Sequence, residues 1–139
     1  IGRFDPRPRL ANSIAPGKSP LHNMSPIIAL RDGLPFATYG IPGGRTIANN
    51  QLNLTVNLID LNMTMQEALD APRLHSEGAE PIQIEDIDKS TLTEFQRLGH
   101  QIQHSSGIGG PGYGVVVADD PAIQSGGTDP RGQGHVMSL

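Results

Sequence analysis

The sequence has 139 residues, with ten Lys and Arg against fourteen Asp and Glu, and a formal net charge of -4. This balance excludes an electrostatic nucleic-acid binder, because affinity for a polyanion requires clustered cations. Hydrophobic residues make up 36% and aromatic residues 4%, so the chain can build one modest core and not two. Without cysteine there is no disulfide, no thiolate metal site and no Cys nucleophile. No stretch approaches the ~18 apolar residues of a membrane span, so none is expected.

The first twenty residues are rich in proline, as in FDPRPR and APGKSP. Each proline removes an amide donor and biases its predecessor toward extended backbone, which predicts an extended arm over 1–20. Residues 21–139 are then expected to form the folded unit. Because the first residue is Ile and not Met, we interpret Ile1 as an internal point of a longer polypeptide, and the sequence does not tell proteolysis, processing and design apart.

The segment SPIIALRDGLPFATYG contains two apolar runs on either side of Asp32-Gly33. Asp-Gly is a strong hairpin signal because Gly accepts a positive φ. Strands are therefore predicted at about 25–31 and 34–40.

The segment after the paired glycines is ambiguous by periodicity alone. An alternation of apolar and polar residues over 52–58 favours a strand, whereas a helical face is formed by Ile47, Gln51, Leu54, Leu58 and Leu61. About fifteen residues without a breaker exceed the usual strand, so the length favours a helix that begins after Gly44.

Two further helices have clear end signals. Thr64 and Glu67 have capping-box spacing ahead of a helix that Pro72 ends, and Asp88 is a typical N-cap for a helix that stops at Gly99. Strands are predicted in PIQIED, HQIQHS, YGVVVADD and AIQSGGTDPR, with a turn at 119–121. The predicted class is α+β, with a mostly antiparallel sheet and helices on a face.

Few residues carry an obvious chemical signal. His100 and His104 are four apart, but Gly99 ends the helix before them, so we expect solvent-facing strand histidines and no metal site. No GxSxG nucleophile turn is present. The loop GIGGPGYG could cradle a phosphate, but a strand and not a helix is expected after it, which argues against that use.

Gly43 and Gly44 stand where a predicted strand ends and a predicted helix begins. Consecutive backbone N–H groups at the positive end of a helix can stabilise an oxyanion. A simple tight turn is the alternative, and the spacing alone favours that turn.

Four motifs in order, NSIAPGKSPLHNMSP, YGIPGGRTI, MQEALDAPRLH and TDPR, resemble the C-terminal part of the small subunit of γ-glutamyltransferase enzymes, over essentially the whole chain. The resemblance implies part of an Ntn-hydrolase αββα sandwich, made as a precursor that cleaves itself to free an N-terminal threonine. That threonine attacks the amide, its own α-amine is the base, and an acyl-enzyme is passed to water or to an acceptor amine.

Residue by residue, the resemblance implies that Gly43 and Gly44 form the oxyanion hole. The family's pair of carboxylate-binding serines is replaced here by His22 and Asn23, which can still donate hydrogen bonds to an anion with a different geometry. This departure puts a γ-glutamyl substrate in doubt, and a loop-shaping role is the alternative. Asp129 and Arg131 are expected to pair and fix a loop, and Arg73 is expected to be structural as well.

The resemblance therefore implies an amide-bond hydrolase or acyltransferase that acts on small amides bearing a carboxylate. The nucleophile lies upstream of Ile1, so the expected partners are the large subunit and the N-terminal part of the small subunit. No cofactor or metal is expected, and the compartment, cytoplasmic or periplasmic, is left open. The alternative is an inactive fragment or binding module that keeps the fold.

Overall fold

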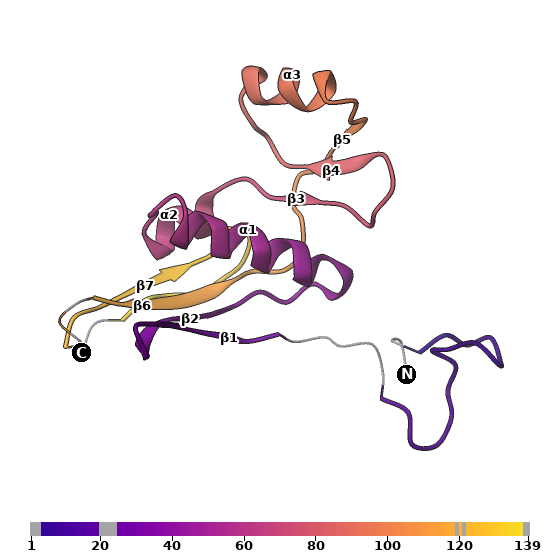
Figure 1. Ribbon diagram of the computed structural model, residues 1–139, viewed down its shortest axis with the longest axis horizontal. Helices are drawn as coiled ribbons and strands as arrows, with labels where there is room; N and C mark the ends of the chain where they lie inside the picture. Colours follow the sequence, from indigo (N-terminus) through magenta and orange to yellow (C-terminus); the bar gives the residue numbers. More distant parts are fainter. Residues whose placement is uncertain (1–3, 20–24, 119, 121, 138–139) are drawn as a thin grey trace.

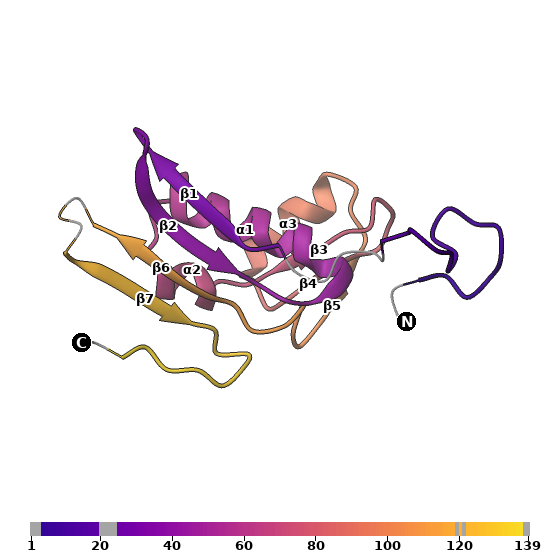
Figure 2. The same cartoon turned by 90° about the horizontal axis from the view of Figure 1, so that it is seen from below.

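The computed structural model describes residues 4–19, 25–118, 120 and 122–137. Its main sheet has four antiparallel strands in the order β1-β2-β6-β7, with bounds Ile27–Arg31, Leu34–Gly40, Tyr113–Val117 and Gln124–Thr128. β1 and β2 form the predicted hairpin, in which Asp32 and Gly33 both adopt positive φ. Two helices, α1 (Ile47–Ile59) and α2 (Met65–Asp70), cover one face of this sheet (Figures 1 and 2).

The helical interpretation of the ambiguous segment is confirmed. A single 3-10 turn, η1 (Gly44–Thr46), leads into α1, whose buried side chains include Ile47, Gln51, Leu54 and Leu58 as the helical pattern predicts. Leu61 departs from that pattern: it is 57% exposed, because α1 ends two residues earlier.

The core lies between the sheet and these two helices. Its buried members are Ala37, Tyr39, Ile41, Leu54, Leu58, Met65, Ala68 and Leu69. Met65 sits directly on β6 and β7, because a Cβ at Gly114 or Gly127 would lie within 2.6 or 2.8 Å of its side chain. The predicted capping box is present at the start of α2, where Thr64 accepts from the Glu67 amide and the Glu67 carboxylate accepts from the Thr64 amide.

A second, smaller sheet contains β3 (Leu74–His75), β4 (Ile82–Ile84) and β5 (Ile102–His104). β3 and β4 are antiparallel, whereas β4 and β5 are parallel and joined through α3 (Lys89–Arg97). The Asp88 side chain caps α3 as predicted, by accepting from the amides of Ser90 and Thr91. This lobe stands beyond the helix layer in Figure 1.

The opposite face of the main sheet carries exposed apolar side chains. Ile28 alternates with the core residues Ile27 and Ala29 and is 74% exposed. The segment over 133–137 crosses part of this face, where Tyr113 donates to the Gln133 carbonyl at 3.0 Å and Val136 lies against Gly126. The described residues thus build one sheet with one helix layer, and leave the second sheet face largely bare.

Residues 4–19 contain no helix and only an isolated bridge between Asp5 and Ser13. This segment lies away from the sheet, beyond the end where β1 begins (Figure 1). Ser13 is buried among its own neighbours, and its hydroxyl accepts from the Leu10 amide at 2.7 Å. Among the described residues, no helix has the length and apolar character needed to cross a bilayer.

Candidate functional site

Gly43 and Gly44 turn the chain between β2 and α1. Gly43 has a φ of 148° and Gly44 a φ of 65°, conformations that residues with a Cβ rarely adopt. The amide and hydroxyl of Thr46 both donate to the Gly43 carbonyl, at 3.4 and 3.2 Å. The amides of Gly43 and Gly44 themselves donate to none of the residues the structure describes. Two free donors therefore stand at the positive end of a helical segment.

The glycine-rich loop before β6 lies directly against this turn. Gly110 donates its amide to the Pro42 carbonyl at 2.9 Å, and a Cβ on Gly43 would lie 3.0 Å from the Gly109 Cα. A Cβ on Gly109 would approach the Asn50 amide nitrogen to 2.3 Å. The loop is followed by strand β6, as predicted, and its glycines allow close packing of two backbone segments.

Asn50, one helical turn after Thr46, joins α1 to the same loop. Its side-chain nitrogen donates to the Ile108 carbonyl at 3.0 Å, and the residue is 1% exposed. Its Oδ1 is the one buried side-chain polar atom among the described residues without a hydrogen-bond partner. Gln51, next in the helix, donates to the Ser25 carbonyl. Sequence reasoning assigned Gln51 to the buried face and missed Asn50, since asparagine has no local signal that distinguishes a buried loop anchor.

A buried ionic network lies behind the glycine-rich loop. The Arg73 guanidinium pairs with Asp129 and donates to the carbonyls of Ile108 and Gly110, at 3.1 and 2.9 Å. The Asp129 carboxylate accepts from the Gly112 amide at 2.8 Å. The prediction that Arg73 is structural is confirmed by these contacts, which fix both ends of the loop.

Arg131 extends this network. Its guanidinium contacts the Asp129 carboxylate at 3.1 Å, as predicted, and also pairs with Glu85. It further donates to the carbonyls of Leu69 and Ala71, at 2.9 and 3.0 Å, at the C-terminal end of α2. Sequence reasoning did not single out Glu85, whose carboxylate also accepts from the amides of Arg73 and Ile108, at 3.0 and 2.7 Å.

These contacts set the charge states of the network. Burial alone would raise the pKa of the Asp129 carboxyl, but hydrogen bonds from the Gly112 and Arg131 amides outweigh it and lower that pKa. The pKa of the Glu85 carboxyl is likewise lowered, because its bonds to Arg131 and to backbone amides outweigh burial. Both carboxylates are therefore ionised opposite their arginines at neutral pH.

His22 and Asn23 lie outside the described residues, as do two residues of the predicted turn, Asp119 and Pro121. The next described residue along the sequence is Ser25, which lines a pocket of about 590 Å³ together with Gly44. His100 and His104 do not form a helical pair: His100 follows α3 and contacts Glu80 at 2.7 Å, and His104 is exposed on β5. No group of three His, Asp or Glu side chains in the described ranges could hold a metal ion.

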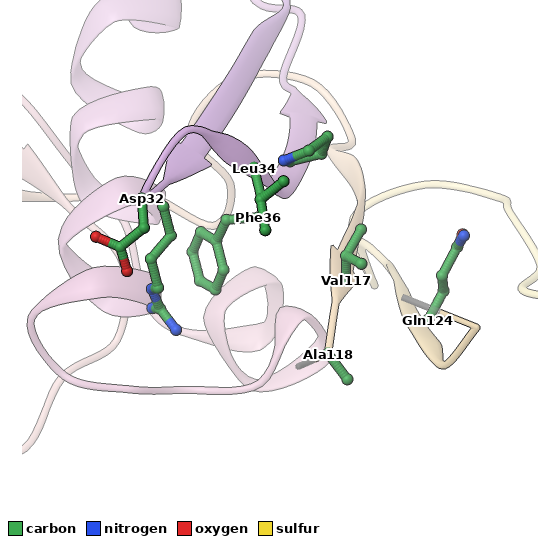
Figure 3. Close-up of a pocket in the computed structure, with 8 residues that line it drawn as sticks. Asp32, Leu34, Phe36, Val117, Ala118 and Gln124 are labelled. Atoms are coloured by element: carbon green, nitrogen blue, oxygen red, sulfur yellow. The ribbon is translucent and has the colours of Figure 1, made fainter. Parts of the chain in front are cut away.

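A second pocket, of about 450 Å³, lies at the tip of the β1–β2 hairpin (Figure 3). Its lining includes Phe36, Val117 and Arg31, whose guanidinium lies 3.9 Å from the centre of the Phe36 ring. The described residues that line it include no Ser, Thr or His. It is also at the opposite end of β2 from Gly43, so the glycine turn remains the candidate site.

The fold has close relatives among solved structures. It superimposes on gamma-glutamyltranspeptidase from Helicobacter pylori, a T380A mutant, with a TM-score of 0.80 and 32% identity, over 88% of this chain and 68% of that one. It also matches cephalosporin acylase from Bacillus halodurans, with a TM-score of 0.78 and 28% identity, over 96% of this chain and 27% of that one. The fold is thus the α+β fold of Ntn hydrolases, as the sequence predicts.

Sequence comparison gives the same result. The gamma-glutamyltranspeptidase family model matches residues 2–139, and the chain belongs to this family. The acylase ACY 1 proenzyme of Pseudomonas sp. (strain SE83) is 34% identical over 98% of this chain and 24% of its own length. The glutathione hydrolase proenzyme of Escherichia coli (strain K12) is 32% identical over 87% of this chain and 21% of its own length. The chain spans about a quarter of these relatives.

Proposed function

We propose that this chain is the C-terminal part of the small subunit of an amide-bond hydrolase or acyltransferase. The nucleophile is an N-terminal threonine upstream of Ile1, and the Gly43 and Gly44 amides stabilise the oxyanion that forms when its hydroxyl attacks the amide carbonyl. The observation that carries this proposal is the pair of free amides, held at the start of a helical segment by the positive φ angles of two glycines.

The free amides matter because the donors of an oxyanion hole must be in place before negative charge develops on the carbonyl oxygen. Donors that are already fixed lose no energy to reorganisation when the tetrahedral intermediate forms. The turn meets this condition, since Thr46 holds the Gly43 carbonyl and Gly110 holds the Pro42 carbonyl at 2.9 Å. An amide that bonded within the protein would have to break that bond first.

The proposed substrates are small amides that bear a carboxylate, either γ-glutamyl compounds or related acid amides of an oxamate-like or glutaryl type. His22 and Asn23 would bind that carboxylate in place of the family's two serines. The similarity to both glutathione hydrolase and acylase proenzymes supports an acyl group outside the γ-glutamyl class as well as within it.

The remaining part of the precursor is the proposed partner. The bare face of the main sheet, with Ile28 at 74% exposure, is the surface it would cover. A second sheet packed there would complete the αββα sandwich.

Trapping of the acyl-enzyme in the complete protein tests this function. The full polypeptide is expressed, its small subunit is sequenced from the N-terminus, and intact mass is measured after brief exposure to γ-glutamyl, glutaryl and oxamate-type amides. We expect a small subunit that begins with Thr and gains the mass of one acyl group. A chain that is never cleaved and gains no mass with any donor would instead support a binding module that keeps the fold.

A further inference from the structure

Four polar side chains form a connected cluster beside the glycine turn. On the helical side are Arg45, which follows Gly44 directly, and Asn49, one turn later in α1. On the other side are His75, in β3, and Glu77, two residues further. Together they line much of the pocket of about 590 Å³ that also contains Gly44. Arg45 and His75 belong to the motifs YGIPGGRTI and MQEALDAPRLH, but the family resemblance assigns neither of them a role.

The central contact joins His75 to Asn49. The Nδ1 atom of the ring lies 2.6 Å from the Asn49 Oδ1 atom, and only 7% of the His75 side chain is exposed. A carboxamide oxygen can only accept a hydrogen bond, so the ring donates from Nδ1. This contact orients the ring, and its Nε2 atom lies 3.5 Å from a carboxylate oxygen of Glu77.

Glu77 connects His75 to Arg45, the residue that follows the glycine turn. Its Oε2 atom accepts from Arg45 Nη1 at 2.7 Å. In addition, Asn53 donates to the Leu74 carbonyl at 3.1 Å, so three side chains spaced four residues apart, from η1 to the middle of α1, contact the segment 74–77. The Arg45 and Glu77 side chains are 71% and 50% exposed, so their pair contributes little by itself. The buried contact between His75 and Asn49 is the stronger restraint.

We propose that His75 is a positioning residue which, by holding Asn49 and facing Glu77, fixes the first turns of α1 and the Gly43–Gly44 turn for oxyanion binding. This inference rests on the proposed function, since it assigns His75 to the same site. Asn50, the next residue of α1, anchors the helix to the glycine-rich loop. The two anchors together prevent the helix start from rotating, and misplacement of a reacting group by about 1 Å can cost roughly 100-fold in rate.

The test uses variants of His75 in the complete, processed enzyme. His75→Asn keeps a donor at the position of Nδ1, whereas His75→Gln places its amide near the position of Nε2 and His75→Leu keeps neither. We expect His75→Leu and His75→Gln to lower kcat for acylation roughly ten- to 100-fold with KM little changed. His75→Asn should restore most of that loss. The matched control is His100→Leu, which removes the 2.7 Å contact with Glu80 in the smaller lobe and should leave kcat unchanged.

Stability is measured on every variant, because a purely structural histidine would lower the melting temperature without lowering kcat of the folded enzyme. If His75→Leu does not fold, Asn49→Leu removes the same contact from the helix and should give the same loss of kcat. An unchanged kcat in folded His75→Leu or Asn49→Leu, or no rescue by His75→Asn, would overturn the proposal.

Replacement of the Gly44 amide by an ester separates this inference from the function on which it rests. Slow acylation in the ester protein together with normal acylation in the His75 variants would refute only the role of His75. Normal acylation in the ester protein would refute the oxyanion hole itself.

Discussion

Arg73 donates to the carboxylate of Asp129, 56 positions further along the chain, and the two side chains are 4% and 0% exposed. This pair joins the segment after α2 to the segment after β7, behind the glycine-rich loop. Charges buried this deeply are stable only when each has its partner.

Asp129→Asn is therefore expected to lower the free energy of unfolding of the complete protein by about 3–5 kcal/mol, because Arg73 would remain buried without its counter-charge. Denaturant titration measures the change. Glu94→Gln is the matched control: it removes the exposed pair of Glu94 with Arg97 and should have little effect on stability. Equal effects of the two substitutions would contradict the assigned role of Asp129.

The lowered pKa values of Glu85 and Asp129 predict a loss of stability in acid. Both carboxyls bind protons more weakly in the folded state, so the unfolded state takes up protons first as the pH falls. Their contribution to stability is complete above the ordinary pKa values, 4.5 for Glu85 and 3.8 for Asp129. It is lost as the pH falls through these values toward the lower pKa values of the folded state. Unfolding experiments between pH 7 and pH 3 should show this decline, and a free energy of unfolding that stays constant would contradict it.

The packing of the glycine-rich loop predicts different outcomes at two nearby glycines. Gly109→Ala would force a methyl group against Asn50 and Thr46, at a residue with a φ of 82°. Gly107→Ala meets nothing within 4 Å. We expect Gly109→Ala to slow acylation at least tenfold, through displacement of the turn that it touches, and Gly107→Ala to have no effect. Acylation rates that fall equally in both would argue against a specific contact with the turn.

The bare sheet face predicts that two apolar residues, both exposed in this chain, differ in their burial in the complete enzyme. Ile28 lies on that face, 74% exposed, and Leu52 lies on α1 on the other side of the sheet, 61% exposed. If the rest of the precursor covers the sheet, Ile28→Lys places an unpaired charge in an interface and should destabilise the complete enzyme by at least about 3 kcal/mol. Leu52→Lys should change stability by about 0.5 kcal/mol or less. Thermal unfolding of both variants measures the effect. If Ile28→Lys does not lower the stability, the sheet face is not covered in the complete enzyme.

The parts of this structure that local signals determine were predictable. The Thr64–Glu67 capping box, the Asp88 cap and the Asp32-Gly33 turn each depend on residues within four positions of one another. The segment whose periodicity fits both a strand and a helix forms helix α1, as its length predicts.

Contacts between distant segments were not predictable from the residues alone. Glu85 is one carboxylate among fourteen acidic residues, and nothing near it in sequence indicates that it meets Arg131, 46 positions away. The parallel pairing of β4 with β5 is also set by packing through α3 rather than by a local turn. The contact between Asn49 and His75 spans 26 positions, so it could be found only in the folded chain.

The most direct test of the oxyanion hole removes one N–H group and nothing else. Gly44→Pro is unsuitable, because Pro requires a φ of about -65° and Gly44 adopts 65°. Replacement of the Gly43–Gly44 amide by an ester in the complete enzyme removes the donor and keeps the flexible residue. Gly17, with a φ of 76° in the arm, provides the matched ester control. A fall in the single-turnover acylation rate by about 10²–10³ at Gly44, and none at Gly17, is predicted. An unchanged rate in the folded Gly44 ester protein would contradict the proposed site.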